Sequence, residues 1–137
     1  MNNVDFFEHT ADVGFRLQRP TRELLFADAA RAMLGLIAPD SQFSAEISKS
    51  VSAQGDDDEQ LFVNWLSELN VIFQTELFVP VEFESIEMMP DSITAQVKGE
   101  RVNPEKHNIE LEIKAVTYHK LYVKQEDEWK AQVIFDI

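Results

Sequence analysis

Hydrophobic residues recur at helical spacing in two segments of the chain. The first segment begins after Pro20 and ends at Pro39, and its apolar positions form one stripe: Leu25, Ala29, Ala32, Met33 and Leu36. Thr21 is the expected N-cap, because its hydroxyl can accept from unpaired N–H groups of the first turn. The second segment has a wider apolar face, typical of a helix that packs on a sheet: Leu61, Phe62, Trp65, Leu66, Leu69, Ile72 and Phe73. Just before it, Asp56 and Glu59 have capping-box spacing.

Apolar and polar residues alternate through much of the remaining chain, which is the period of a half-buried strand. Strands are predicted at Val4–Glu8, Gly14–Gln18, Phe43–Ala53, Val81–Met88, Ile93–Gly99, Ile109–Ala115, Leu121–Val123 and Trp129–Ile137, and a turn at Asn103–Lys106. The strands mostly follow one another as hairpins, and helices are few. The pattern therefore predicts an α+β fold, a two-layer sandwich of two helices on a largely antiparallel multi-stranded β-sheet. We expect residues 1–137 to form one domain, since 137 residues suit a single core.

Composition narrows the function classes. The net charge is −13, from 12 basic and 25 acidic residues, which argues against direct binding to a nucleic-acid backbone. The charge either keeps the protein soluble or lets an acidic face dock on a basic protein. Without cysteines, any metal site must use oxygen or imidazole ligands. No apolar run reaches the length of a membrane span or a signal peptide, so we expect a cytoplasmic protein with no membrane contact.

Carboxylates at the two ends of the chain are candidates for a metal site. Asp12 lies near one end, and Asp136 precedes the α-carboxylate of Ile137 at the other. Two unit charges about 4 Å apart repel by roughly 4 kcal/mol at an effective dielectric near 20. If folding brings these groups together, a hard divalent cation with oxygen ligands would relieve the repulsion. Spacing alone leaves open the alternative that they sit at a solvent-exposed strand end.

The three histidines are the other candidates for chemistry. His9 and His119 lie close to threonines, and His107 follows a turn. Histidine serves as acid, base or ligand, but an exposed or hydrogen-bonded histidine with no such role is the commoner case. The chain contains no nucleophile elbow, glycine-rich phosphate loop or His-Glu-x-x-His motif. No catalytic residue is therefore predicted.

Several blocks together resemble one known family. They are Glu8–Gly14, Glu68-Leu69 in the aromatic-rich helix, Gly99-Glu100, Asn103–His107, Ile113–His119 and Asp136-Ile137. In this order they resemble the archease family, from residue 5 to residue 137. The resemblance implies an accessory protein and not an enzyme. Archeases stimulate the GTP-dependent tRNA-splicing RNA ligase by promoting guanylylation of its active-site histidine and multiple turnover.

The resemblance also implies a site and its alternatives. A divalent metal, calcium or else magnesium or manganese, would be held by Asp12, Asp136 and Ile137. His9, Lys114 and His119 are candidates for contacting the partner or supporting the site. The other functions to weigh are a chaperone-like modulator of a tRNA methyltransferase and a metal-dependent hydrolase.

Overall fold

The structure is a computed structural model, and residues 4–9 and 11–137 are described; Thr10, within the Glu8–Gly14 block, lies outside the described residues. The elements in chain order are β1 (Val4–Glu8), β2 (Asp12–Arg19), α1 (Arg22–Ile37), β3 (Ile47–Gln54), α2 (Asp58–Glu76), β4 (Phe78–Met89), β5 (Ser92–Arg101), β6 (Ala115–Gln125) and β7 (Trp129–Asp136).

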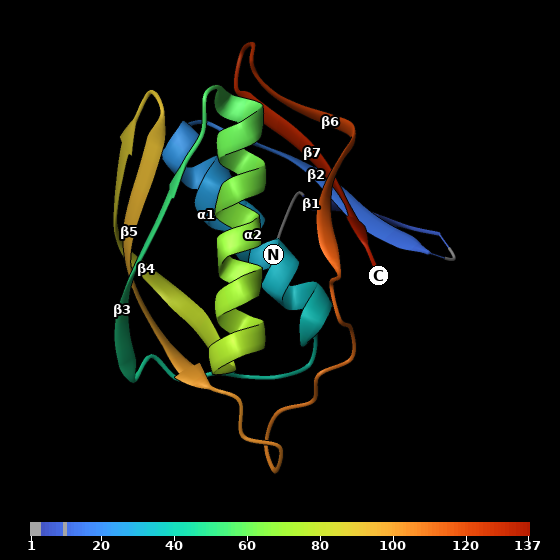
Figure 1. Ribbon diagram of the computed structural model, residues 1–137, viewed down its shortest axis with the longest axis vertical. Coiled ribbons are helices and arrows are strands. Elements are labelled where there is room, and N and C mark those ends of the chain that lie inside the picture. Colours follow the sequence, from blue (N-terminus) through green and yellow to red (C-terminus); the bar gives the residue numbers. More distant parts are fainter. Residues whose placement is uncertain (1–3, 10) are drawn as a thin grey trace.

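The strands form two antiparallel sheets with the helices between them (Figure 1). One sheet has the order β1-β2-β7-β6, and the other has the order β3-β5-β4. Helix α1 contacts β2 and β7 on one side and β4 on the other, while α2 contacts β6 and the three strands of the smaller sheet. The α+β class is thus confirmed, and the strands divide between two sheets where the sequence suggested one.

Both helices begin at side-chain caps. Thr21 caps α1 as predicted, and its Oγ1 accepts from the Leu24 N–H at 3.2 Å. The cap of α2 is Asp57, one residue later than the Asp56–Glu59 spacing suggested, with Oδ1 accepting from the Gln60 N–H at 2.8 Å. Asp57 is the cap because Gln60 completes a reciprocal pair of bonds with this turn. The Gln60 side chain reaches back to the main chain, where its Oε1 accepts from the Asp56 N–H at 2.6 Å.

The predicted strand Ile109–Ala115 is wrong up to its last residue, where β6 begins. This alternating segment belongs to the connection that carries the chain from β5 in one sheet to β6 in the other. Its main chain is bound by the helices: Glu110 N–H donates to Ile37 O at 2.8 Å, and Ile113 O accepts from Asn70 Nδ2 at 2.9 Å. Alternation alone does not reveal whether such groups pair with a strand or a helix.

A shared hydrophobic core fixes the helices against both sheets. The predicted stripes of α1 and α2 are buried in it, together with inward residues of the strands. Trp65 and Phe62 of α2 and Phe26 of α1 are fully buried, and the Phe26 and Phe62 rings meet edge to face at 5.1 Å. Neither described helix combines the length and apolar character that crossing a bilayer requires.

Candidate functional site

The register of β2 against β7 places Asp12 directly opposite Asp136. The neighbouring pair, Val13 opposite Phe135, is buried in the core, so strand alternation turns both aspartates to the outer face of the sheet. Side chains of directly opposed residues have Cβ atoms about 4.5–5.5 Å apart. The fold therefore brings together two carboxylates that are 124 positions apart in the chain.

Main-chain hydrogen bonds hold the surroundings of this pair. The β1–β2 turn is closed by the His9 N–H, which donates to Asp12 O at 2.8 Å. The Ile137 N–H donates to Ala11 O at 3.2 Å, which extends the β2–β7 pairing past Asp136. The three residues predicted as metal ligands, Asp12, Asp136 and Ile137, thus lie around one point of the sheet.

The residues predicted to contact the partner or support the site lie at different distances from the acid pair. The Lys114 N–H donates to Asp136 O at 2.8 Å, so Lys114 adjoins the acid pair. His119 lies farther along β6, in a bulge where the register shifts between Thr117 and Tyr122. Its N–H donates to Thr117 Oγ1 at 3.3 Å. The structure therefore places His9 and Lys114 beside the acid pair and His119 away from it.

The acid pair suits a hard cation. Within residues 4–9 and 11–137, neither Asp12 nor Asp136 forms an ion pair, and like charges directly opposite each other on strands are destabilising. In the same residues no three Asp, Glu or His side chains gather at a metal-binding spacing. A metal here would use two carboxylates and complete its shell with main-chain oxygens and water. Calcium accepts such ligands readily, and magnesium usually keeps several waters.

A second polar group on the same sheet face was not anticipated from the sequence. A cavity of about 260 Å³ is lined by Phe7, His9, Arg16, Lys120, Gln132 and Ile134. Arg16 Nε donates to Asp5 Oδ2 at 2.6 Å, and this bond raises the pKa of Arg16 above its usual value. Alternation could have placed Arg16 on this face, but only the bulge of β6 brings Lys120 over it.

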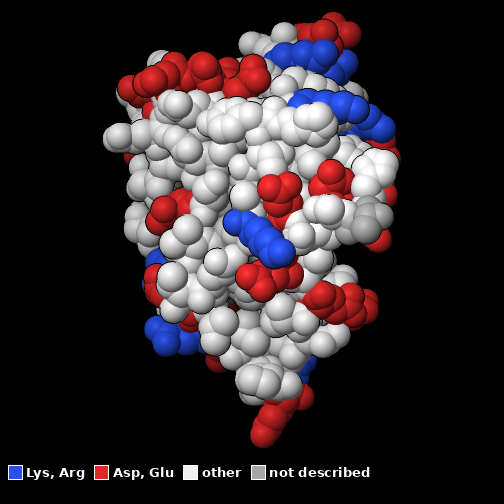
Figure 2. All heavy atoms as spheres, turned by 45° about the vertical axis from the view of Figure 1, so that its right-hand side comes forward, with Lys and Arg blue, Asp and Glu red and all other residues white. Residues whose placement is uncertain are grey.

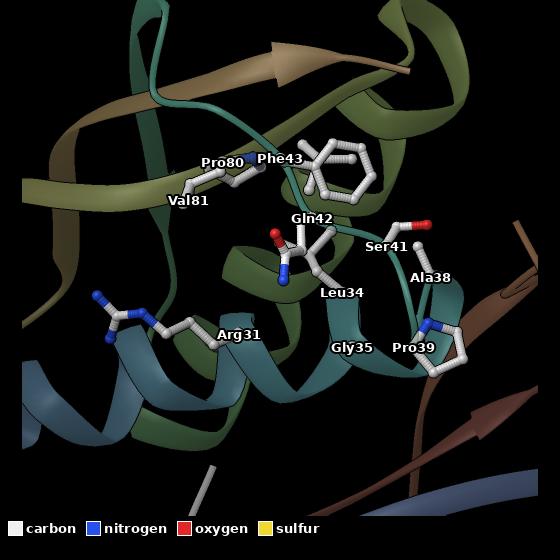
Figure 3. Close-up of a pocket in the computed structure, with 11 residues that line it drawn as sticks. Arg31, Leu34, Gly35, Ala38, Pro39, Ser41, Gln42, Phe43, Pro80 and Val81 are labelled. Carbon is white, nitrogen blue, oxygen red and sulfur yellow. The ribbon is translucent and has the colours of Figure 1, made fainter. Parts of the chain in front are cut away.

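A separate groove of about 440 Å³ lies between α1, the segment after it and β4. Figure 3 shows Arg31 at one end, Pro39 at the other, and Phe43 and Pro80 on the opposite wall from α1. This groove is on the far side of the helices from the outer face that carries Asp12, so it is not part of the acid site.

His107 fixes one wall of this groove, which explains that histidine structurally. Its Nδ1 accepts from the Asn103 N–H at 2.8 Å, so Nε2 carries the proton and donates to Gln42 O at 2.9 Å. Its ring stacks on Phe43 with centroids 4.0 Å apart. Nearby, the Ser44 N–H donates to Glu100 and lowers the pKa of that carboxyl. These bonds tie the segment after α1 to the end of β5 and to the β5–β6 connection.

Gly35 in the floor of the groove leads to a stability prediction. Apart from its chain neighbours and the backbone of its own helix, a Cβ at this position of α1 would have no atom within 4 Å, so alanine fits without a clash. We expect Gly35→Ala to raise the free energy of unfolding by about 0.5–1 kcal/mol, because glycine in a helix loses more backbone entropy on folding. Urea denaturation followed by circular dichroism measures the change. A destabilised Gly35→Ala variant would contradict the open floor seen in the structure.

Comparisons with known proteins agree with the fold and cover the whole site. Residues 5–137 match the Archease protein family. A protein archease of Methanosarcina acetivorans is 40% identical over 138 residues, covering 97% of this chain and 94% of its own. One of Pyrococcus abyssi is 34% identical over 142 residues and both chains are covered completely.

Two solved structures are also similar. The solution structure of a Methanobacterium thermoautotrophicum protein superposes with a TM-score of 0.81 at 32% identity, and both chains are fully covered. The crystal structure of a Thermotoga maritima archease, described as a possible chaperone, has a TM-score of 0.66 at 22% identity. It covers 96% of this chain and 94% of its own, and it supports the fold alone. On the match across residues 5–137 and these full-length relatives, the chain belongs to the archease family.

Proposed function

We propose that this protein is a cytoplasmic accessory factor that binds a divalent cation at Asp12, Asp136 and Ile137 and activates a GTP-dependent RNA ligase. The observation that carries the proposal is the opposition of Asp12 and Asp136 across the β2–β7 pair, with no cationic partner among the described residues. Membership of the archease family supports the ligase as the partner. The activator has no catalytic residue of its own in this proposal.

In this proposal some site residues bind the ion and others bind the partner protein. Asp12 and Asp136 would supply carboxylate ligands to the ion, and the carboxylate or carbonyl of Ile137 would bind alongside them. Calcium is the expected metal, with magnesium or manganese as alternatives. A cation held by these residues would supply positive charge near the phosphates of the nucleotide bound to the ligase. The main chains of His9 and Lys114 bond to the pair, and in this proposal their side chains would contact the ligase.

Surface charge supports a basic partner. Figure 2 shows a band of Asp and Glu side chains across the upper left of one face and further acidic groups scattered below it. With a net charge of −13, the protein is attracted over long range to a protein that is basic because it binds RNA. The association rate should therefore fall as salt is raised.

The test replaces each aspartate by asparagine, which keeps the shape of the side chain and removes its charge. We expect Asp12→Asn and Asp136→Asn to abolish calcium binding measured by calorimetry and to reduce ligase guanylylation to the rate of the ligase alone. Asp91→Asn is the matched control, because Asp91 is exposed on the β4–β5 turn of the other sheet. Undiminished stimulation by both site variants would exclude the acid pair from the function.

Two further arms separate the alternative functions. The protein incubated alone with phosphoesters and Mg²⁺, Ca²⁺ or Mn²⁺ should show no turnover; hydrolysis that Asp12→Asn removes would favour a metal-dependent hydrolase instead. Added to a tRNA methyltransferase from the same cells, it should leave the methylation pattern unchanged. A changed pattern, without any effect on the ligase, would favour the chaperone-like role.

A further inference from the structure

A concave site lies on the outer face of the four-stranded sheet, close to the acid pair but separate from it. Its cavity of about 260 Å³ is lined by Phe7, His9, Arg16, Lys120, Gln132 and Ile134. None of these six is acidic, although the chain carries 25 Asp and Glu residues. The lining instead presents a guanidinium, an ammonium, an imidazole and a carboxamide.

The sheet register sets the distance between the two sites. Asp12, Gly14 and Arg16 alternate to the same face of β2, so the Cα atoms of Asp12 and Arg16 are about 13 Å apart. Gly14 lies between them, and Phe7 is its partner on β1. The Phe7 ring lies over Gly14, where a Cβ would come within 2.7 Å of its Cε2 atom. Phe7 therefore forms a wall of the cavity on the side of the acid pair.

Two hydrogen bonds orient the Arg16 guanidinium and leave other N–H groups unused. Its Nε donates to Asp5 Oδ2 at 2.6 Å and its Nη1 to Gln132 Oε1 at 3.2 Å. The guanidinium also lies 5.5 Å from the centre of the Phe7 ring. A guanidinium has five N–H donors, so these two bonds leave most of them for a ligand.

Lys120 lies in a bulge of β6 and has a left-handed backbone conformation. The four residues 118–121 of β6 bulge opposite the single residue Val133, and Lys120 has φ 54°. The left-handed backbone conformation raises the free energy of a lysine residue, and it persists only where the surrounding structure imposes it. Here Gln132 Nε2 donates to Lys120 O at 3.0 Å and pins the bulge. The Lys120 ammonium forms no ion pair with a described residue.

We propose that this cavity binds a phosphate group, as carried by a phosphate monoester or a polyphosphate, with Arg16 and Lys120 as its charged donors and His9 at its rim. Arg16, Lys120 and His9 come from three different segments of the chain and line the same cavity. A tetrahedral group with several acceptor oxygens satisfies such donors, and guanidinium and ammonium groups both recognise phosphate. Gln132 is a positioning residue, because its amide holds both Arg16 and the bulge.

The experiment is an NMR titration of the ¹⁵N-labelled protein with inorganic phosphate and pyrophosphate, in EDTA and without ligase. We expect saturable shifts of the Gly14, Lys120 and Gln132 amide signals. Arg16→Gln and Lys120→Asn should each weaken binding about tenfold, the value of a lost charged hydrogen bond. Asparagine is chosen at position 120 because it tolerates the left-handed conformation. Lys98→Asn, which removes a half-buried lysine of the other sheet, should leave binding unchanged.

Two pairs of ligands identify which kind of molecule supplies the phosphate. One pair is a nucleoside monophosphate and its nucleoside, and the other is a short RNA with and without a 3′-phosphate. Binding that depends on the phosphate in either pair supports the inference and identifies the source. Shifts that do not saturate, shifts spread over other lysines, or equal weakening by Lys98→Asn would overturn it. Because neither metal nor ligase is present, this result is independent of the proposed ligase activation.

Discussion

Replacing Trp65 by alanine is expected to lower the free energy of unfolding by about 3–5 kcal/mol. Trp65 is fully buried on α2, where its side chain joins three elements. Its Nε1 donates to Phe26 O of α1 at 2.9 Å, and its ring lies 6.2 Å from the Phe83 ring of β4. Alanine would leave a large cavity and would also remove one of the hydrogen bonds that a buried main-chain carbonyl accepts.

Urea denaturation monitored by circular dichroism tests this expectation. Val71→Ala is the matched control, because Val71 lies on the same helix but is 51% exposed, and it should shift stability by less than about 0.5 kcal/mol. Trp65→Phe keeps most of the volume and should fall between the two. Equal losses for Trp65→Ala and Val71→Ala would show that α2 does not pack as described.

Replacing Gly14 by alanine is expected to damage stability and the acid pair together. The backbone of Gly14 does not need a positive φ, so the requirement for glycine is steric. A Cβ would come within 2.4 Å of Val133 O on β7, which is main chain and cannot rotate away. We expect a loss of about 1–3 kcal/mol from this overpacking. The β2–β7 pair must open locally, which would displace Asp12 from Asp136.

Calcium binding and urea denaturation should therefore both change in Gly14→Ala. Gly35→Ala is the control for the same chemical change, since its Cβ meets open space and it should bind calcium normally. If Gly14→Ala keeps both its stability and its calcium affinity, then the close approach of β2 and β7 does not set the geometry of the acid pair.

Local features of the fold could be predicted from the sequence. The Thr21 cap, the end of α1 before Pro39 and the strand Val4–Glu8 follow from short-range chemistry, and the structure confirms them. The capping residue of α2 was misplaced by one position, because Asp56 and Asp57 both precede a residue that can complete the motif.

Long-range features could not be predicted. The alternation of Ile109–Ala115 matches a strand, but Asn70 binds the carbonyl of Ile113 and no ladder forms there. The division into two sheets depends in the same way on which segments meet. For the site, residue types identified Asp12 and Asp136 as candidates, and only the register shows them facing each other. The role inferred for Lys120 depends on a bulge with no local signature.

The central position of β7 has a consequence for how the protein is made. β7 follows every other strand in sequence, yet it lies between β2 and β6 in the larger sheet. On a ribosome, β2 and β6 would emerge with unpaired edges and wait for β7, and such long-range pairing is slow and exposes nascent chains to aggregation. The aspartate pair would then form only in the last step of folding, so a chain stalled or cleaved before β7 carries no working site.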